Sequence, residues 1–274
     1  MIETLSSDQN PRVQLVHKLI TQSKTRHKEG LFVAEGPRLI EDGLKSRFPL
    51  DFVFLRTHAS LRAQQVLNTV PIKIPRFELD DRLFDSLSDT ENSQGLLAVF
   101  HQIDLPLPDK LDFVLVPDGI RDPGNLGTMI RTSEAAGVQA LLIPPGTVDP
   151  WSPKVVRSGM GSHFRLPILE RNWQAIANFL EGMNCFGAAM NGHISCWEAD
   201  FHSPTALLIG SEAEGLGSDA LTQVTQTLRI PMAGKNESLN AAISAAILAF
   251  EVLRQRSQSD DHQSHKTKSS SDND

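Results

Sequence analysis

The most informative segment of the chain is Ile230-Pro-Met-Ala-Gly-Lys-Asn-Glu-Ser-Leu-Asn-Ala-Ala-Ile243. It begins as a short apolar strand, passes through a flexible turn over 233–236 and enters a long Ala-rich helix at Ser238, Leu239 and Asn240. The first backbone N–H groups of a helix have no partner within the helix, so they can bind a ligand. A strand that leads into such a helix start therefore predicts an α/β domain with a binding site at this junction.

Two further glycine-bearing segments precede this junction and also follow apolar strands. They are Asp118-Gly-Ile-Arg-Asp-Pro-Gly-Asn-Leu-Gly-Thr-Met-Ile-Arg131 and Ile209-Gly-Ser-Glu-Ala-Glu-Gly-Leu-Gly217. Ligands of open α/β sheets bind beyond the carboxyl ends of the strands, so we expect the three segments to share one site. Neither segment contains the G-x-G-x-x-G or the G-x-x-x-x-G-K-[ST] pattern, which argues against a dinucleotide-dependent dehydrogenase and a P-loop nucleotide hydrolase.

In this order, the three segments resemble the motifs of the SpoU-type RNA ribose methyltransferases of the SPOUT superfamily. The resemblance covers about Phe113 to Arg256. It implies a knotted α/β fold with a parallel sheet, S-adenosylmethionine as cofactor and a homodimer formed through the C-terminal domain. Independently of the resemblance, strands alternate with helices after Phe113, which predicts a parallel sheet covered on both faces.

The resemblance also implies roles for individual residues in catalysis and cofactor binding. The catalytic set is Asn125, Arg131, Glu212, Ser238 and Asn240, and the cofactor set is Gly210, Ile230, Met232 and Leu239. Because arginine keeps its proton at physiological pH, we expect Arg131 to hold a phosphate and the 2′-hydroxyl rather than to act as a base. A glycine at position 210 lets the backbone approach a ligand closely, and the apolar members suit an adenine face.

Each of these residues also has a purely structural interpretation. Asn125 and Ser238 could each be a plain helix cap. Arg131 could pair with Glu134 on a helix surface. Glu212, in isolation, is typical of a solvated turn. The agreement of all the motifs in one ordered pattern favours the functional interpretation.

The chain is expected to contain two domains. The proline-interrupted segment Asp104-Leu-Pro-Leu-Pro-Asp-Lys110 predicts a connector. The expected organisation is an RNA-binding domain over 1–104, a linker over 105–111, a methyltransferase domain over 112–256 and a disordered tail over 257–274. The tail is rich in Ser, Asp, His and Lys and has no large apolar residue, so it cannot form a core.

Apolar periodicity predicts the elements of both domains. In the first, we expect helices over 11–26, 37–44, 59–67 and 79–87 and strands over 31–34, 51–55, 71–74 and 96–100. In the second, we expect strands over 113–116, 140–143, 185–190, 206–209 and 228–230 and helices over 125–136, 173–180 and 238–256.

The N-terminal domain resembles the substrate-binding domain of many SpoU-type enzymes through Leu31-Phe-Val-Ala-Glu-Gly-Pro-Arg-Leu-Ile-Glu-Asp-Gly43. Such domains are similar to RNA-binding ribosomal proteins. The net charge of −7 argues against nucleic-acid binding, but no acid interrupts the basic residues between Pro11 and Lys28. A solvated helix face explains this cluster equally well. The expected RNA-contacting residues are Arg12, Lys18, Lys24, Arg26, Lys28 and Arg38.

Composition limits the remaining classes of protein. The chain has 274 residues, of which 40% are hydrophobic and 22% charged, as is typical of a globular protein of two domains. No apolar run reaches the roughly 18 residues of a membrane span, so we expect a cytoplasmic protein without membrane contact. Cys185 and Cys196 are expected to be reduced thiols, and no ligand spacing indicates a metal site.

We therefore expect an S-adenosylmethionine-dependent enzyme that methylates a ribose 2′-hydroxyl in structured RNA. Ribosomal RNA is favoured over transfer RNA, because a separate N-terminal domain suits a specific RNA loop. Two alternatives remain: a non-catalytic RNA-binding or ribosome-assembly protein on the same fold, and a methyltransferase that acts on a base or a protein. Cofactor binding distinguishes the enzyme from the non-catalytic alternative, and the chemistry of the product distinguishes ribose methylation from methylation of a base or a protein.

Overall fold

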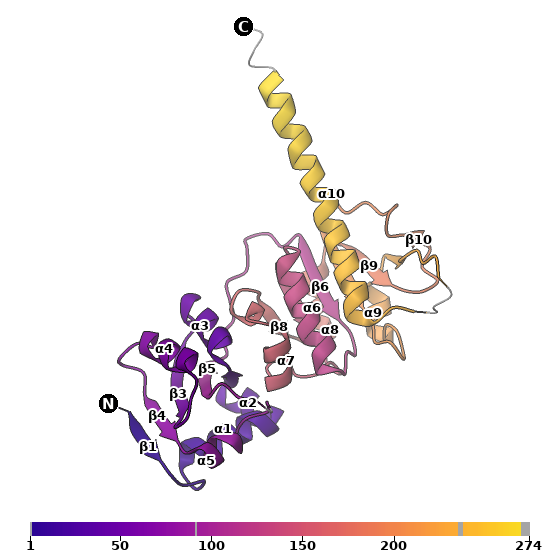
Figure 1. Ribbon diagram of the computed structural model, residues 1–274. Coiled ribbons are helices and arrows are strands. Elements are labelled where there is room, and N and C mark those ends of the chain that lie inside the picture. Colours follow the sequence, from indigo (N-terminus) through magenta and orange to yellow (C-terminus); the bar gives the residue numbers. More distant parts are fainter. Residues whose placement is uncertain (1, 91, 235–237, 270–274) are drawn as a thin grey trace. The chain divides into compact units, whose positions relative to one another are not determined.

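The structure, a computed structural model, describes residues 2–90, 92–234 and 238–269. The chain divides into two compact units, and Figure 1 labels many of their elements. The first unit comprises Met1–Asp104 and Asp149–Arg165, and the second comprises Leu105–Val148 and Leu166–Asp274. Each unit has its own sheet and its own buried core.

The first unit is built on a mixed five-stranded sheet. Its strands are β1 (Glu3–Leu5), β2 (Leu31–Glu35), β3 (Leu50–Arg56), β4 (Arg76–Leu79) and β5 (Leu96–His101). Its helices include α1 (Pro11–Thr21), α2 (Ser23–Glu29), α3 (Pro37–Lys45), α4 (Leu61–Thr69) and α5 (Asp81–Asp85). The strand order is β1-β4-β3-β5-β2, and β5 is antiparallel to both of its neighbours. Val16 and Leu19 of α1 join Phe54 and Leu79 of the sheet in one buried cluster.

The first unit also contains a segment from the middle of the chain. Residues 149–165 carry α7 (Pro153–Ser158) and a short 3-10 turn (Ser162–Phe164). The ring centre of Phe164 lies 5.2 Å from that of Phe100, and the ring centre of Trp151 lies 4.9 Å from that of Phe32. Burial of these rings holds the segment in the first unit, whereas the sequence places it within the domain over 112–256.

The second unit is built on a seven-stranded sheet in which all paired neighbours are parallel. Its strands are β6 (Phe113–Pro117), β7 (Ala140–Ile143), β8 (Ile168–Glu170), β9 (Asn184–Ala188), β10 (Ile194–Ser195), β11 (Thr205–Ile209) and β12 (Gln226–Arg229). Its helices are α6 (Pro123–Ala135), α8 (Trp173–Leu180), α9 (Ser218–Gln223) and α10 (Ala241–Ser269). The order is β10-β12-β9-β11-β6-β7-β8, which confirms the predicted parallel sheet.

Two local predictions in the first unit are wrong. The strand expected over 71–74 is a turn, and the strand begins only at Arg76. Pro71 and Pro75 lack the backbone N–H that a sheet ladder uses, and Ile72 is 96% exposed. The single helix expected over 11–26 divides at Gln22, where the backbone is extended, into α1 and α2.

The last helix is longer than the sequence predicts. The expected end was Arg256, followed by a disordered tail, but α10 continues to Ser269. Lys and Gln, which the tail contains, have good helix propensity even where no core is available. Residues 270–274 lie outside the described residues. No helix among the described residues is long and apolar enough to cross a membrane.

Candidate active site

The first two glycine-bearing segments meet at one edge of the seven-stranded sheet. Strands β6 and β11 are parallel neighbours, with Pro117 paired to Ile209 at their carboxyl ends. The backbone N–H of Asp118 then donates to the carbonyl of Ile209 at 2.8 Å. Both loops therefore leave the sheet at the same place, as expected for a site beyond the strand ends.

The third segment joins them through one hydrogen-bonded network. Glu212 Oε1 accepts from Asn125 Nδ2 at 2.7 Å, from Asn240 Nδ2 at 3.0 Å and from the backbone N–H of Ala241 at 3.2 Å. Asn240 Nδ2 also donates to Asn125 Oδ1 at 3.0 Å. The structure thus brings together three of the predicted catalytic residues, one from each segment.

The caps of the two helices at this site differ from the structural alternatives. Asp122 caps α6, because its side chain accepts from the backbone N–H of Asn125 at 2.8 Å. Asn240 caps α10, because its Oδ1 accepts from the N–H groups of Ala242 and Ile243 at 3.0 and 3.2 Å. The side chain of Asn125 therefore does not cap α6, and Ser238 does not cap α10.

Two polar residues that the sequence analysis did not select hold the loops in place. The buried carboxylate of Asp118 accepts from the backbone N–H of Gly217 at 2.7 Å. Thr147 Oγ1 donates to the carbonyl of Pro117 at 2.7 Å and accepts from the N–H of Gly119 at 3.1 Å. A polar residue directly after a buried strand is the signal that could have identified Asp118.

A cavity of 490 Å³ lies beside the network. Its lining includes all four residues of the predicted cofactor set (Gly210, Ile230, Met232 and Leu239) together with Glu212 and Ser238. This volume is within the range of roughly 300–1,000 Å³ for ligand pockets, which are mostly apolar with a few polar groups. The backbone N–H groups of Ile230 and Leu239 donate to no described residue, so they remain available to an adenine edge. The residues present therefore fit the predicted cofactor.

The structure gives Gly210 a second requirement in addition to the predicted one. A Cβ at this position would lie 2.2 Å from the backbone carbon of Gly215. The two sides of this loop are closed by Ser211 and Gly215, which exchange backbone hydrogen bonds of 3.1 and 2.9 Å. The glycine allows the loop to fold tightly on itself, whereas the sequence analysis attributed it to close approach of a ligand.

Arg131 and Ser238 are the predicted catalytic residues that the structure leaves outside the network, although Ser238 lines the cavity. Arg131 lies apart from both. Its side chain is exposed on α6 and does not line the 490 Å³ cavity. Within the described residues it makes no hydrogen bond or ion pair, so the alternative pairing with Glu134 is not observed. An unpaired guanidinium on the surface is available to a phosphate.

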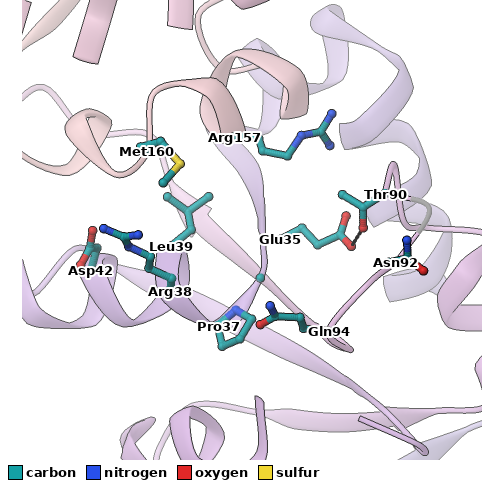
Figure 2. A pocket seen from close by; sticks show the side chains of 11 residues that line it. Glu35, Pro37, Arg38, Leu39, Asp42, Thr90, Asn92, Gln94, Arg157 and Met160 are labelled. Atoms are coloured by element: carbon teal, nitrogen blue, oxygen red, sulfur yellow. Dashed lines mark hydrogen bonds between the residues drawn. The ribbon is translucent and has the colours of Figure 1, made fainter. Parts of the chain in front are cut away.

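The predicted RNA-contacting residues divide into exposed and buried ones. Lys18, Lys24, Lys28 and Arg12 are exposed, and the Arg12 guanidinium lies 4.6 Å from the centre of the Phe77 ring. Arg38 is exposed and lines a second cavity, in the first unit (Figure 2).

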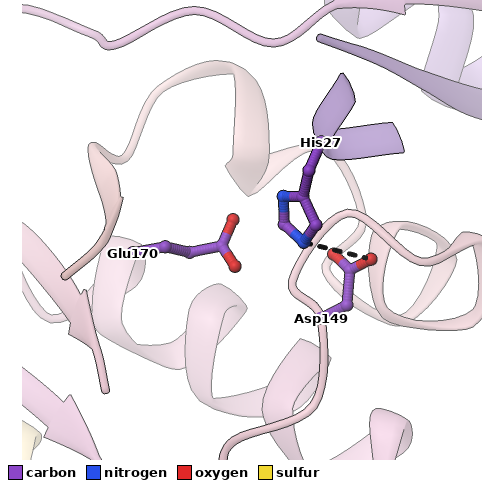
Figure 3. Close-up of side chains that lie close together, drawn as sticks. All are labelled: His27, Asp149 and Glu170. Carbon is purple, nitrogen blue, oxygen red and sulfur yellow. Dashed lines mark ion pairs between the residues drawn. The ribbon is translucent and has the colours of Figure 1, made fainter. Parts of the chain in front are cut away.

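Arg26 is not available to RNA, which corrects one prediction. Its side chain is buried and donates through Nε to Asp149 Oδ2 at 2.7 Å and through Nη1 to the carbonyl of Leu19 at 2.6 Å. His27 approaches the same carboxylate at 4.0 Å (Figure 3). The charge periodicity of the sequence cannot show that one of the cations turns inward to hold residues 149–165.

Comparison with known proteins gives the family. Residues 112–250 match the SpoU rRNA Methylase family, and residues 10–98 match the MRM3-like substrate binding domain. The chain belongs to the SpoU rRNA methylase family. This result confirms the family and the α/β class predicted from the sequence.

Several relatives are similar over nearly the whole chain. The 23S rRNA (guanosine(2553)-2'-O)-methyltransferase RlmP of Bacillus subtilis is 32% identical, over 92% of this chain and 99% of its own length. Human rRNA methyltransferase 3, mitochondrial, is 29% identical over 89% of this chain and 72% of its own length. The crystal structure of an AdoMet-bound rRNA methyltransferase from Sinorhizobium meliloti is 30% identical, with a TM-score of 0.82 over 93% of this chain and 98% of that one.

Proposed function

We propose that this protein transfers the methyl group of S-adenosylmethionine to a ribose 2′-hydroxyl of ribosomal RNA. The observation that carries the proposal is the network of Asn125, Glu212 and Asn240 beside the 490 Å³ cavity. Relatives named as rRNA methyltransferases, one of them bound to AdoMet, support the same reaction and cofactor.

The cavity residues would hold the cofactor, and the network would keep the cavity in shape. When bound, S-adenosylmethionine supplies an electrophilic methyl group on a sulfonium, to which the 2′-oxygen forms a bond as the sulfur–methyl bond breaks. Glu212 contributes to the cavity wall and anchors the start of α10 through Ala241. Such fixed positioning supplies much of the rate in a displacement of this kind.

Arg131 would act on the RNA. Its unpaired guanidinium can donate to the phosphate next to the target ribose and to the 2′-oxygen. It cannot take up the hydroxyl proton, because an arginine is always protonated at physiological pH. Asn125, Ser238 and Asn240 would orient the loops around the ribose, and Asn125 and Asn240 already hold the carboxylate of Glu212.

The active form would be a homodimer through the C-terminal domain. Ile243 and Phe250 of α10 are 48% and 45% exposed, and residues seven apart lie on nearly the same helix face. Ile243 lies one turn beyond the capping residue Asn240, so a dimer contact on this face would begin next to the network and extend along α10 to Phe250. The predicted cytoplasmic location stays a prediction, since the human relative is mitochondrial.

The proposal is tested with the full chain, S-adenosylmethionine labelled in its methyl group, and purified ribosomal and transfer RNA in separate reactions. We expect label in ribosomal RNA. Arg131→Ala should abolish transfer and leave the cofactor Kd unchanged, while Arg82→Ala, the same change on an exposed helix of the first unit, should retain activity. A protein that binds no cofactor and transfers no label to either RNA would favour a non-catalytic RNA-binding protein and contradict the proposal.

A further inference from the structure

The first unit contains a cavity of 220 Å³ at the start of α3. Its wall is formed by the beginning of α3, by the loop before β5, by Arg157 of α7 and by Met160 just after that helix (Figure 2). The lining carries the polar side chains of Arg38, Asn92, Gln94 and Arg157 and the carboxylate of Asp42, one turn along α3 from Arg38. The apolar side chains include Leu39 and Met160. This volume is below the roughly 300–1,000 Å³ of pockets for larger ligands, so it suits a group about the size of one nucleobase.

One partly buried carboxylate organises the loop that forms the polar wall. The carboxylate of Glu35 accepts from the hydroxyl groups of Ser88 at 2.6 Å, Thr90 at 2.7 Å and Ser93 at 2.7 Å. It also accepts from the backbone N–H of Asp89 at 3.3 Å. These bonds fix the loop before any ligand arrives, and such preorganisation favours binding.

The polar wall presents groups that have no partner within the described residues. The carboxamides of Asn92 and Gln94 are exposed and make no side-chain hydrogen bond there. Each carboxamide offers two donors and an acceptor, the combination that reads the edge of a base. Arg38 also makes no ion pair with a described residue, while Arg157 is held by Asp89 at 3.2 Å. Arg38 is thus the cation available to a phosphate.

The apolar wall carries an unusual backbone conformation. Met160 has a φ of +48° and its side chain is 40% exposed. Non-glycine residues with positive φ are uncommon and concentrate at functional sites. Among the described residues of the first unit, no aromatic side chain is among the exposed large apolar ones. Stacking on a base would therefore fall to Met160, Leu39 and the Arg38 guanidinium.

We propose that this cavity binds one unpaired nucleotide of the RNA substrate. The base lies against Leu39 and Met160, Asn92 and Gln94 contact its edge, and Arg38 contacts its phosphate. Sequence-specific recognition of RNA usually takes this form, with an unstacked base held by side chains and read at its edge. This proposal rests on the proposed function, in which RNA is the substrate. It adds a site that selects which RNA is methylated.

The first test does not depend on methyl transfer. The chain contains six methionines, so the full protein labelled with [¹³C-methyl]methionine gives a simple spectrum in which Met160→Leu identifies the Met160 signal. Each of the four nucleoside 5′-monophosphates is added up to about 10 mM, because a few contacts give roughly millimolar affinity. We expect the Met160 signal to shift with at least one of them, and the shift to be lost in the Asn92→Ala/Gln94→Ala variant.

The second test uses methylation of ribosomal RNA. Asn92→Ala/Gln94→Ala should raise the KM for RNA about tenfold, as expected for two lost hydrogen bonds, without changing the cofactor Kd or the rate at saturating RNA. Gln65→Ala/Asn68→Ala, the same changes at exposed positions of α4, should leave the KM unchanged.

The two tests separate the cavity from the proposed activity. An active wild-type enzyme with an unmoved Met160 signal and an unchanged KM in the Asn92→Ala/Gln94→Ala variant would overturn the nucleotide site. A shifted Met160 signal in a protein that methylates no RNA would keep the nucleotide site and overturn the methyltransferase proposal.

Discussion

Replacing Asn240 with aspartate should break the network while preserving the cap of α10. Asn240 Oδ1 accepts from Ala242 and Ile243, and an aspartate keeps that acceptor. Asn240 Nδ2, however, donates to Glu212 Oε1 and Asn125 Oδ1, both at 3.0 Å. In Asn240→Asp an oxygen takes the place of this donor and faces two acceptors.

The size of the effect follows from these contacts. The bond to the Glu212 carboxylate contributes about 1.5–3 kcal/mol and the neutral bond to Asn125 about 1 kcal/mol. Two carboxylates about 3 Å apart repel by roughly 1.4 kcal/mol at the dielectric constant of water. Because Glu212 and Asn240 are exposed, water and loop movement will relieve part of this sum. We take the net increase in the activation free energy as about 2 kcal/mol, which corresponds to roughly a thirtyfold loss in kcat.

The assay is methyl transfer to ribosomal RNA by Asn240→Asp, Glu212→Gln and the double variant. Glu212→Gln supplies an amide donor toward the new carboxylate, and Asn125 can turn its carboxamide to match. Only the bond from the Ala241 N–H is then lost, because this donor faces the new amide NH2. The double variant should therefore be more active than Asn240→Asp alone, with a coupling free energy of at least about 1 kcal/mol. Additive losses, or a kcat for Asn240→Asp within twofold of wild type, would refute this account of the network.

Three further perturbations test separate parts of the structure. Gly210→Ala places a Cβ 2.2 Å from the Gly215 backbone, so calorimetry should show at least about a tenfold loss of cofactor affinity; an unchanged Kd would contradict the tight-loop explanation. Arg26→Met leaves Asp149 buried without its cation and should lower the free energy of unfolding by about 3 kcal/mol. This variant should not change the salt dependence of RNA binding, whereas Lys24→Ala/Lys28→Ala should flatten it. Burial lowers the pKa of His163 from 6.5 to about 4. As the pH falls, the unfolded chain therefore binds a proton at this residue before the folded protein does, and the free energy of unfolding decreases by roughly 3 kcal/mol between pH 6.5 and 4. Urea titrations of His163→Gln should lack this decrease, and an equal dependence of stability on pH in the variant and the wild type would exclude His163 as its source.

The predicted catalytic residues came from the resemblance, and the strand ends explain why three of them meet. Asn125, Glu212 and Asn240 belong to segments that each follow a strand, and parallel strands release their loops at one edge. That rule, together with the resemblance, was enough to assemble the network and the cavity lining. The knot was implied by the resemblance alone, and no strand order was predicted, because periodicity identifies strands but not the path between them.

The parts that sequence analysis missed depend on contacts between distant residues. Trp151 and Phe164 are held in the first unit by rings of Phe32 and Phe100, and no local pattern encodes that pairing. Arg26 lies between the exposed Lys24 and Lys28 in the sequence, yet it turns inward to Asp149. Local patterns show which residues are charged, whereas burial is decided by tertiary packing.

The central claim, methylation of a ribose 2′-oxygen, is tested most directly by the chemistry of the labelled product. Ribosomal RNA labelled by the enzyme is hydrolysed completely in alkali, a reaction that requires a free 2′-hydroxyl next to each phosphate. The account predicts label in alkali-resistant dinucleotides, and in a 2′-O-methylated nucleoside after full enzymatic digestion. Label recovered in mononucleotides, as a methylated base, would contradict it.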